Sequence, residues 1–398
     1  MAAANKKEMG QYFTTSEALQ QFVFDRVRHK GCHLLEPSFG AGHLLRKFIA
    51  YDAAYPMTCY ELDSTIEPVV ALDPRFQKVI YGDFTQQQQH MAFQTIIANP
   101  PYVKRAARGG GQNLYLTFVQ RCFELLAATG EMIFIIPSDF LKLTSASPTI
   151  EAMTKEGAFT DFWFPHDEKL FEGASIDVVV FRYEKGPGPR GGMCVVNGQM
   201  RYCHVRKGIV TFSAEAEADG DRVPVSDLFH VYVGLVSGRD GLYNVDFGNI
   251  QMLQDKDVVT TWIFTTEFPT ADAQINAHLL AHKPALLDRR IKKFGEHNWF
   301  EWGAPRNIKH METHWGKPCL YVRNMTRQAE VAFAGTVQYF GGALLCLVPK
   351  QAMGAAALEQ VCAWLNTAEF RGNYTYAQRF KMGQKQLENA MISRESLK

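Results

Sequence analysis

Hydrophobic residues in the first half of the chain occur in short apolar runs that alternate with stretches of helical periodicity. This alternation is typical of a mostly parallel sheet covered by helices, because a helix usually joins each parallel strand to the next. The stretch 114–128 places Leu114, Phe118 and Cys122 on one stripe, which predicts a helix that packs on the sheet. We expect seven strands, at 33–36, 58–61, 78–81, 95–98, 132–136, 159–164 and 177–183, and helices at 16–28, 42–51, 114–128 and 147–156.

A proline- and glycine-rich run at residues 184–192 interrupts this pattern. Proline lacks a backbone donor and glycine resists ordering, so a strand should not continue through the run. We therefore expect one domain at 1–187 and a second at 188–398. The second half has β-like runs at 192–206 and 331–349 and helical stretches at 269–283 and 355–368, which predict a separate domain of mixed α+β structure.

The composition narrows the class of protein. Among 398 residues, 46% are hydrophobic and 21% charged, which suits a folded core and excludes a disordered chain. No run approaches the roughly 18 uninterrupted apolar residues of a membrane span, and the first residues lack the apolar core of a signal peptide. Eight cysteines without a Cys-x-x-Cys pair favour free thiols in a reducing compartment, so we expect a cytoplasmic protein without a membrane partner.

Glycine and acidic residues follow the first three predicted strands. The first strand enters a turn with Gly40 and Gly42, the second ends at Glu61, and the third ends at Asp83 and Phe84. Parallel sheets bind ligands at the carboxyl ends of their strands, and an acidic residue about 20 positions after the glycines typically accepts hydrogen bonds from ribose hydroxyls. A glycine turn alone could be an ordinary strand–helix connection, but the three features together predict an adenosine pocket. Without a Gly-Lys-Ser/Thr loop, a nucleoside cofactor lacking phosphates is expected.

The fourth strand ends in Asn99-Pro100-Pro101-Tyr102. Two prolines fix the backbone and make a stiff loop. The Asn99 side-chain oxygen and the Pro100 carbonyl could then accept both N–H bonds of a planar exocyclic amine, while Tyr102 stacks on the ring that carries it. The alternative is a proline-rich turn with Tyr102 in the core.

These motifs, in this order, resemble the gamma class of S-adenosylmethionine-dependent DNA adenine-N6 methyltransferases, in particular the TaqI-type enzymes. The resemblance begins at residues 10–15, where Thr15 replaces the usual proline, and extends to about residue 183. It implies an α/β fold, with a seven-stranded Rossmann-like methyltransferase sheet followed by a DNA-recognition domain. It also implies S-adenosyl-L-methionine as the cofactor and a flipped-out adenine as the substrate.

The resemblance assigns roles residue by residue. It implies that Thr14, Glu36 and Gly40 surround the methionine end of the cofactor, and that Glu61 binds the ribose. Asn99, Pro100, Pro101 and Tyr102 are the expected catalytic residues, and Ser38, Leu62, Asp83, Phe84, Asn99, Pro101 and Phe134 complete the expected cofactor contacts.

A second aromatic ring is expected against the flipped base, because stacking offsets part of the cost of removing it from the duplex. The resemblance indicates Phe171, in Lys-Leu-Phe-Glu-Gly, for this position. Phe164 is a rival, and either ring could belong to the core.

Cations in two regions suggest contacts with DNA phosphates. Lys104, Arg105 and Arg108 lie on a glycine-rich loop just after the catalytic motif. In the second half, cations alternate with aromatic residues between 282 and 327, as in a surface that grips phosphates and reads bases. The candidates there are Arg289, Arg290, Arg306 and Arg323. Either group could instead be a solvated surface.

His310 and His314 do not match the His-Glu-x-x-His zinc helix, so we expect no metal. The predicted function is therefore site-specific methylation of adenine N6 in double-stranded DNA, in restriction-modification or DNA protection. We expect a monomer whose cognate restriction endonuclease, if any, is a separate chain. The alternatives are an RNA or release-factor N-methyltransferase with the same Asn-Pro-Pro-Tyr chemistry, and a non-catalytic DNA-binding subunit.

Overall fold

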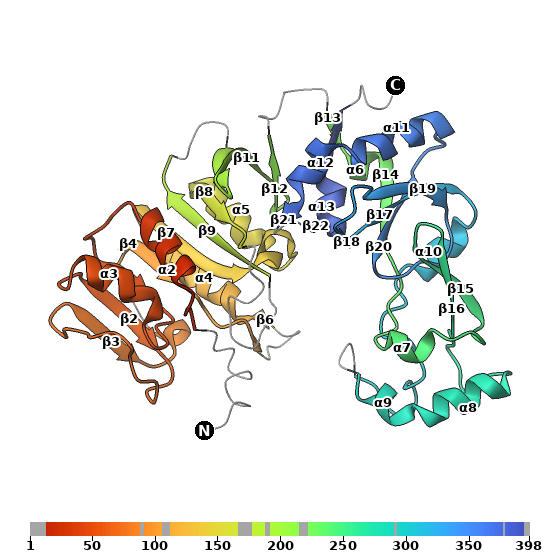
Figure 1. The fold of residues 1–398 in the computed structure, drawn as a ribbon, viewed down its shortest axis with the longest axis horizontal. Coiled ribbons are helices and arrows are strands. Elements are labelled where there is room, and N and C mark those ends of the chain that lie inside the picture. Colours follow the sequence, from red (N-terminus) through yellow and green to blue (C-terminus); the bar gives the residue numbers. More distant parts are fainter. Residues whose placement is uncertain are drawn as a thin grey trace. The chain divides into compact units, whose positions relative to one another are not determined.

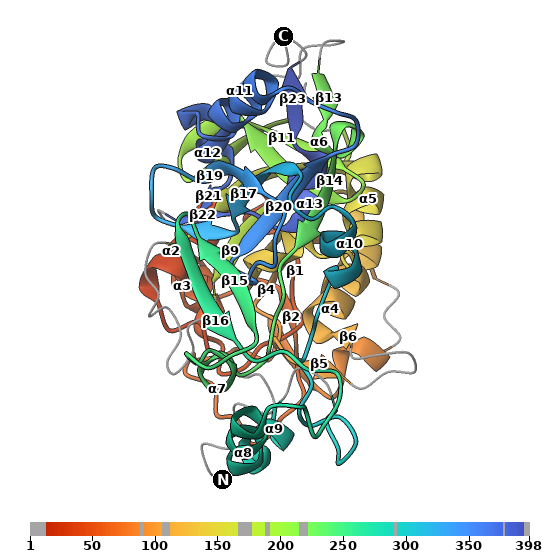
Figure 2. The same cartoon turned by 90° about the vertical axis from the view of Figure 1, so that its right-hand side faces the viewer.

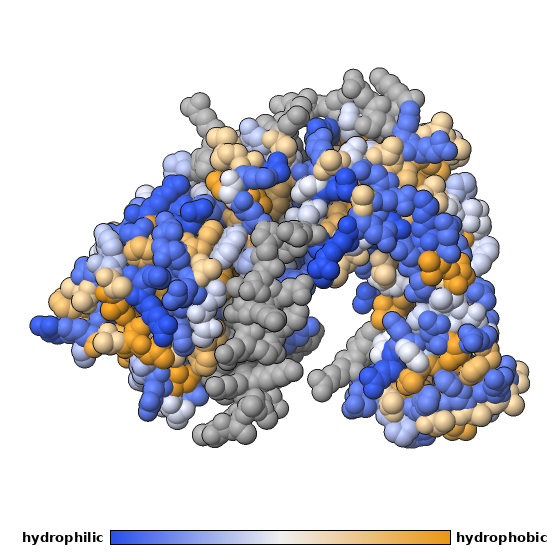
Figure 3. Space-filling model, in the orientation of Figure 1, coloured by the Kyte–Doolittle hydropathy of each residue, from blue (hydrophilic) through white to orange (hydrophobic). Residues whose placement is uncertain are grey.

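The computed structural model describes residues 13–87, 91–105, 112–165, 177–187, 192–214, 222–289, 293–376 and 379–393. The chain forms two compact units, Met1–Ala216 and Glu217–Lys398 (Figure 1). Where the described residues are visible in Figure 3, polar side chains predominate and apolar ones form only small groups. None of the described helices is long and apolar enough to cross a membrane.

The described part of the first unit is built on a ten-stranded sheet, in the order β12-β11-β10-β8-β9-β7-β4-β1-β2-β3. β1, β2, β3, β4 and β7 run parallel, whereas β9 is antiparallel to both β7 and β8. All seven predicted strands are present in this sheet. Their bounds are β1 Leu34–Glu36, β2 Met57–Glu61, β3 Gln77–Tyr81, β4 Phe93–Ala98, β7 Leu126–Pro137, β8 Gly157–Trp163 and β9 Val178–Lys185.

Three further strands correct both the predicted strand number and the predicted boundary. β10 (Met193–Val196) pairs in parallel with β8, and β11 (Gln199–Arg206) and β12 (Ile209–Ser213) follow as antiparallel neighbours. Phe212 of β12 packs edge-on against Phe162 of β8, with ring centroids 4.8 Å apart. The division between the units therefore falls after Ala216 and not at 187, because the chain returns to the sheet beyond the proline- and glycine-rich run.

Helices in the first unit lie close to their predicted positions. α4 (Leu114–Leu125) buries Leu114, Phe118 and Cys122, which confirms the predicted stripe. This helix ends earlier than expected because β7 begins at Leu126. The remaining elements are α2 Glu17–Arg26, α3 Arg46–Tyr51, α5 Ser147–Glu156, the 3-10 turns η1 His43–Leu45, η2 Phe84–Gln86 and η3 Ser138–Lys142, and the hairpin β5 Lys104–Arg105 and β6 Gln112–Asn113.

A buried ion pair ties the middle of this sheet to the segment after α2. Arg182 of β9 donates from Nε to Glu131 Oε2 of β7 at 2.9 Å, and both residues are almost fully buried. The second carboxylate oxygen of Glu131 accepts the backbone N–H groups of Arg28 and His29, each at 2.8 Å. The Glu131 carboxylate is thus compensated by hydrogen bonds on both oxygens, as a buried charge requires.

The second unit is organised around a four-stranded antiparallel sheet in the order β14-β20-β17-β19 (Figure 2). Alternate residues of β17 (Pro318–Arg323) enter different cores: Cys319 and Tyr321 join one cluster, and Leu320 and Val322 join the other. The sheet is therefore covered on both faces, since successive side chains of a strand point to opposite sides. The other three strands are β14 Phe229–Val233, β19 Ala332–Thr336 and β20 Leu344–Pro349.

Smaller elements surround this sheet, so the second unit has the mixed α+β character predicted for the second half. Its further strands are β13 Arg222–Pro224, β15 Ile250–Asp255, β16 Val258–Trp262, β18 Met325–Thr326, β21 Thr375–Tyr376, β22 Arg379–Lys381 and β23 Met391–Ser393. Its helices are α6 Val225–Leu228, α7 Asp240–Tyr243, α8 Ala273–Ala281, α9 Lys283–Leu287, α10 Ile308–Thr313, α11 Ala355–Leu365, α12 Ala368–Asn373 and α13 Gln384–Asn389.

Candidate active site

The predicted site residues of the first unit meet at one edge of the sheet. Glu36 ends β1, Glu61 ends β2, Asp83 follows β3 and Asn99 follows β4. These four strands are neighbours and run parallel, so their carboxyl ends lie along the same edge. This is the edge at which open α/β sheets bind ligands.

Glu61 connects the turns that follow the first two strands. Its Oε2 accepts the backbone N–H of Gly40 at 2.7 Å, and its Oε1 accepts the N–H of Asp63 at 2.9 Å. Gly40 has φ +55°, and a Cβ there would lie 3.1 Å from the Phe13 ring, so glycine suits both the backbone and the space. Each carboxylate oxygen can accept a further hydrogen bond, which leaves Glu61 able to receive hydroxyl donors.

Glu36 is buried beneath the first turn, with 1% of its surface exposed. Its Oε1 accepts both the backbone N–H and the hydroxyl of Ser38, each at 3.0 Å. Burial raises the pKa of Glu36 to about 8; the bonds from Ser38 oppose the increase, and the nearby charge of Glu61 adds to it. At neutral pH this carboxyl group is therefore mostly protonated, and a cation placed beside it would favour its ionised form.

The side chains expected around the cofactor's adenine differ in exposure. Asp83 accepts the N–H and the hydroxyl of Thr85 at 2.9 and 2.7 Å, which fixes its carboxylate at the start of η2. Leu62 presents an apolar side chain that is 57% exposed. Phe84 is buried beside Tyr60, with ring centroids 5.2 Å apart, so Leu62 is the more accessible apolar surface.

Phe134 is fully buried, and its ring stacks on that of Phe181 at 5.7 Å. The ring therefore packs in the sheet core and shows no surface to a ligand. Its predicted contact with the cofactor would require the core to open.

A hydrogen-bond chain fixes the Asn99 side chain. Its Nδ2 donates to Thr14 Oγ1 at 2.9 Å, and its Oδ1 accepts the Tyr102 hydroxyl at 2.6 Å. Thr14 is itself buried, and its carbonyl accepts from Gln20 Nε2 at 2.7 Å. The structure thus brings Thr14, expected at the cofactor's methionine end, into direct contact with the expected catalytic amide.

Tyr102 is partly buried rather than enclosed in the core. Besides its contact with Asn99, its hydroxyl lies 2.9 Å from the carbonyl oxygen of Ile135. Its ring meets that of Tyr115 edge-on, with centroids 6.4 Å apart. The loop therefore holds an aromatic ring next to the Asn99 amide.

Two buried polar atoms near this edge have no hydrogen-bond partner among the described residues: the hydroxyl oxygen of Tyr115 and Nδ1 of His43. A buried polar group without a partner costs about 1–3 kcal/mol, so such atoms indicate places where a polar ligand could bind. His43 begins η1 directly after the glycine turn, and Tyr115 lies in the first turn of α4 beside Tyr102. Neither residue was among the candidates from the sequence. The feature that could have indicated them is a polar side chain within an apolar stretch.

The cationic loop after the motif is only partly described. Lys104 lies on β5 and is exposed, and Arg105 pairs through its backbone with Gln112 of β6. Arg108, Arg290 and Phe171 lie outside the described residues. Phe164, the rival of Phe171, is buried at 2% exposure and packs edge-on against Phe212, so it belongs to the core.

Two of the predicted DNA-binding arginines have structural roles instead. Arg289 is 6% exposed, and its guanidinium donates to the carbonyls of Leu286, Ser237 and Trp299 at 2.8, 2.9 and 2.6 Å. Arg323, also 6% exposed, donates to Asp255 at 2.7 Å. Both guanidinium groups therefore bind oxygen atoms inside the second unit. This corrects the prediction that Arg289 and Arg323 contact DNA phosphates.

The interleaved aromatic residues of this region are largely core residues too. Trp299, Phe300 and Trp302 belong to one hydrophobic cluster, and the Trp302 Nε1–H donates to the carbonyl of Ile263 at 2.7 Å. Arg306 remains exposed, so it is the predicted cation of this unit whose position stays compatible with a DNA contact. Within the described ranges, no group of three or more histidine, cysteine or acidic residues could hold a metal ion.

Known proteins resemble parts of this chain. A model of the Eco57I restriction-modification methylase family matches residues 71–171. The type II methyltransferase M.HincII of Haemophilus influenzae is 26% identical over 204 residues, which are 47% of this chain and 39% of that protein. A type II methyltransferase of Thermus thermophilus is 28% identical over 207 residues, which are 46% of each protein. The match thus spans less than half the length of these relatives.

One structural likeness extends over both units. The type IIL restriction-modification enzyme MmeI, solved in complex with DNA, aligns with 98% of this chain and 69% of its own, with a TM-score of 0.58 and 10% identity. This likeness concerns the fold alone. The family match and the two relatives confirm the resemblance to restriction-modification methyltransferases.

Proposed function

We propose that this chain is a DNA methyltransferase that transfers the methyl group of S-adenosylmethionine to adenine N6 within a specific duplex sequence. The observation that carries the proposal is the Asn99 amide, which Thr14 and Tyr102 hold at the end of β4. The similarity to restriction-modification methyltransferases supports DNA, and not RNA or a release factor, as the substrate.

The residues at the strand ends fit the cofactor chemically. Glu36 would face the ammonium of its methionine part, Glu61 the ribose hydroxyls, and Asp83 with Leu62 the adenine. The buried Nδ1 of His43, which has no hydrogen-bond partner among the described residues, further indicates a ligand at this edge. When bound, the cofactor supplies a methyl group made electrophilic by its sulfonium.

The Asn-Pro-Pro-Tyr loop would prepare the amine for attack. Adenine N6 is a poor nucleophile because its lone pair is delocalised into the ring. Asn99 Oδ1, which accepts the Tyr102 hydroxyl, and the Pro100 carbonyl would accept the two N–H groups and hold the nitrogen in a pyramidal geometry. The nitrogen held in this way would accept the methyl group that the sulfonium gives up, and it would then release one proton to solvent.

The base must leave the duplex to reach this loop. Tyr102 would stack on one face of the flipped adenine, and Phe171 remains the expected ring on the other. Lys104 and Arg306, both exposed, are the described cations proposed to contact DNA. We further propose that the second unit recognises the target sequence, that the protein acts as a monomer in the cytoplasm, and that any restriction endonuclease is a separate chain.

A methyl-transfer assay tests this function directly. Purified protein is incubated with S-adenosylmethionine labelled in the methyl group and with duplex DNA, ribosomal RNA or a release factor as separate substrates. We expect label in DNA, recovered as N6-methyladenine after digestion. Label in RNA or protein but not in DNA would overturn the proposal, and cofactor binding without transfer to any substrate would favour a non-catalytic subunit.

The protonation of Glu36 predicts a pH-dependent affinity for the cofactor. The free protein keeps the Glu36 proton below about pH 8, whereas the bound ammonium requires the carboxylate. Affinity should therefore increase as the pH rises from about 6 towards 8, with release of almost one proton at pH 7. Calorimetry in buffers of different ionisation enthalpy measures this proton. Glu36→Gln should abolish the release, and an unchanged release would exclude Glu36 as its source.

Thr14 should influence turnover through Asn99. Thr14→Val removes the acceptor for the amide and should lower the turnover number about tenfold, the effect of one lost hydrogen bond of about 1.4 kcal/mol. Thr14→Ser should keep most of the activity. In the background of Asn99→Ala, Thr14→Val should cause little further loss; a full additional tenfold loss would show that Thr14 acts independently of the amide.

A further inference from the structure

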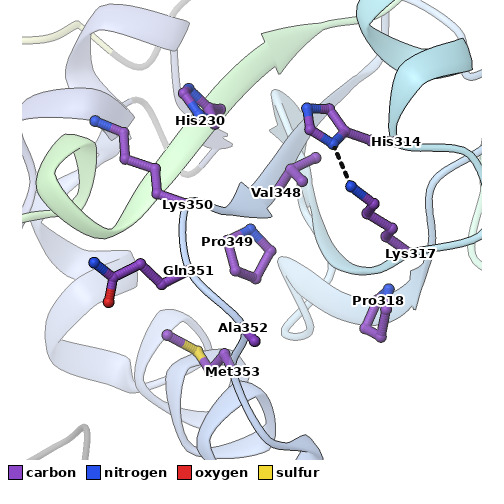
Figure 4. Close-up of a pocket in the computed structure, with 10 residues that line it drawn as sticks. All are labelled: His230, His314, Lys317, Pro318, Val348, Pro349, Lys350, Gln351, Ala352 and Met353. Carbon is purple, nitrogen blue, oxygen red and sulfur yellow. Dashed lines mark hydrogen bonds between the residues drawn. The ribbon is translucent and has the colours of Figure 1, made fainter.

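A cavity of about 360 Å³ lies in the second unit, at the start of β17 and the end of β20 (Figure 4). Val348 and Pro349 contribute apolar lining at the end of β20. His230 reaches the cavity from β14, and His314 from the C-terminal end of α10. Four separate elements thus contribute to one cavity within a single folded unit.

The polar lining of this cavity is entirely basic or neutral. The polar and charged side chains are those of His230, His314, Lys317, Lys350 and Gln351, and none of the described residues that line the cavity is acidic. Glu312, an acidic residue of the adjoining α10, accepts the Tyr339 hydroxyl at 2.9 Å. The cavity therefore offers hydrogen-bond donors and positive charge without a carboxylate in its lining.

Aromatic rings order the histidines on this side of the cavity. Tyr232 and His310 stack with ring centroids 5.3 Å apart, and the His230 ring lies nearly parallel to those of Tyr232 and His314, at 6.1 and 6.4 Å. The imidazoles are thus held in a fixed stack beside the cavity.

Lys317 determines the tautomer of His314. Its Nζ lies 3.2 Å from His314 Nδ1, and because an ammonium can only donate, Nδ1 must be the acceptor. Nε2 therefore carries the ring proton and is a donor. Burial lowers the pKa of His314, and the positive charges of Lys317, His230 and His310 lower it further. The positive charge of Lys317 thus lies beside a neutral His314, and a bound anion would be attracted to this charge.

We propose that this cavity binds a phosphate group, with Lys317 and His314 as donors, and that the phosphate is one of a DNA strand. The apolar lining beside the donors suits the sugar that a backbone phosphate carries. The choice of a DNA strand rests on the proposed function, whereas phosphate binding does not. A free phosphate or nucleotide would present the same chemistry, so the two sources must be separated by experiment.

Nuclear magnetic resonance of the histidine rings tests the phosphate site without DNA or cofactor. Inorganic phosphate is titrated into the full-length protein, and the ring signals of His314 and His230 are assigned by substitution. We expect these signals to shift in a saturable manner and the pKa of His314 to rise with bound phosphate. Lys317→Gln should weaken phosphate binding at least tenfold. Lys256→Gln, which removes an equal charge from an exposed lysine paired with Glu330, should leave it unchanged.

Duplex DNA binding, followed by fluorescence anisotropy over a range of salt concentrations, identifies the source of the phosphate. Lys317→Gln should weaken binding several-fold for any sequence and reduce the salt dependence by the equivalent of about one phosphate contact. Phosphate binding with unchanged DNA affinity would overturn the assignment to a DNA strand. Histidine signals that do not respond to phosphate would overturn the site altogether, whatever the outcome of the methyl-transfer assay.

Discussion

Replacing Asn99 with alanine should lower the turnover number at least ~100-fold, within the range for losing one preorganised hydrogen-bonding group at a reacting centre. The amide oxygen is the side-chain acceptor proposed for the amine, and the structure fixes its position through Thr14 and Tyr102. The affinity for S-adenosylmethionine should change little, because the carboxylates of Glu36 and Glu61 remain. Single-turnover kinetics on saturated duplex DNA measure the chemical step, and calorimetry measures cofactor binding.

Tyr102→Phe is the matched variant for this experiment. It keeps a ring for stacking but removes the hydroxyl that donates to Asn99 Oδ1, so it should reduce the rate less than Asn99→Ala does. Normal turnover in Asn99→Ala would reject the role assigned to the amide. A loss confined to cofactor affinity would leave Asn99 only its expected role as a cofactor contact and would reject its role in the chemical step.

Arg182→Met should destabilise the protein by about 3–5 kcal/mol, because it leaves the Glu131 carboxylate buried without its charge partner. Glu131 has no exposed surface, so water cannot replace the guanidinium. The two backbone donors from Arg28 and His29 satisfy only one carboxylate oxygen. Urea denaturation followed by tryptophan fluorescence measures the change in the free energy of unfolding.

The exposed pair of Arg75 and Asp73 provides the control for this substitution. These side chains approach to 2.6 Å at the surface, where water and salt screen the interaction. Arg75→Met should therefore leave the unfolding midpoint within experimental error. Equal destabilisation by the two substitutions would show that burial of the Arg182 pair has no special effect.

The positions of the seven predicted strands along the chain, and the polar residues that follow them, could be predicted because both follow from local pattern. Each predicted strand was an apolar run with a turn signal after it, and Glu61, Asp83 and Asn99 stand directly behind such runs. The position of β10, β11 and β12 in the sheet could not be predicted in this way. The run 192–206 was expected to be β-like, but nothing in its pattern indicates that it returns to the edge of an existing sheet.

The second unit shows what a pattern of charges cannot specify. Arg289 and Arg323 resemble surface cations in the sequence, yet their guanidinium groups bind carbonyl or carboxylate oxygens inside the fold. The sequence shows which residues are basic, but whether a basic side chain is buried depends on segments that are distant along the chain. For the same reason, the sequence does not reveal that the Tyr115 hydroxyl has no hydrogen-bond partner among the described residues, because partners come from the whole fold.

The strands β10, β11 and β12 determine where this protein could be cut and rejoined to a foreign recognition module. A hybrid spliced at residue 188 would lose all three strands and leave β8 as a bare edge, a template for aggregation. A hybrid spliced after Ala216 keeps the sheet whole. If the second unit recognises the target sequence, as proposed, its exchange for a foreign module should begin from the later junction.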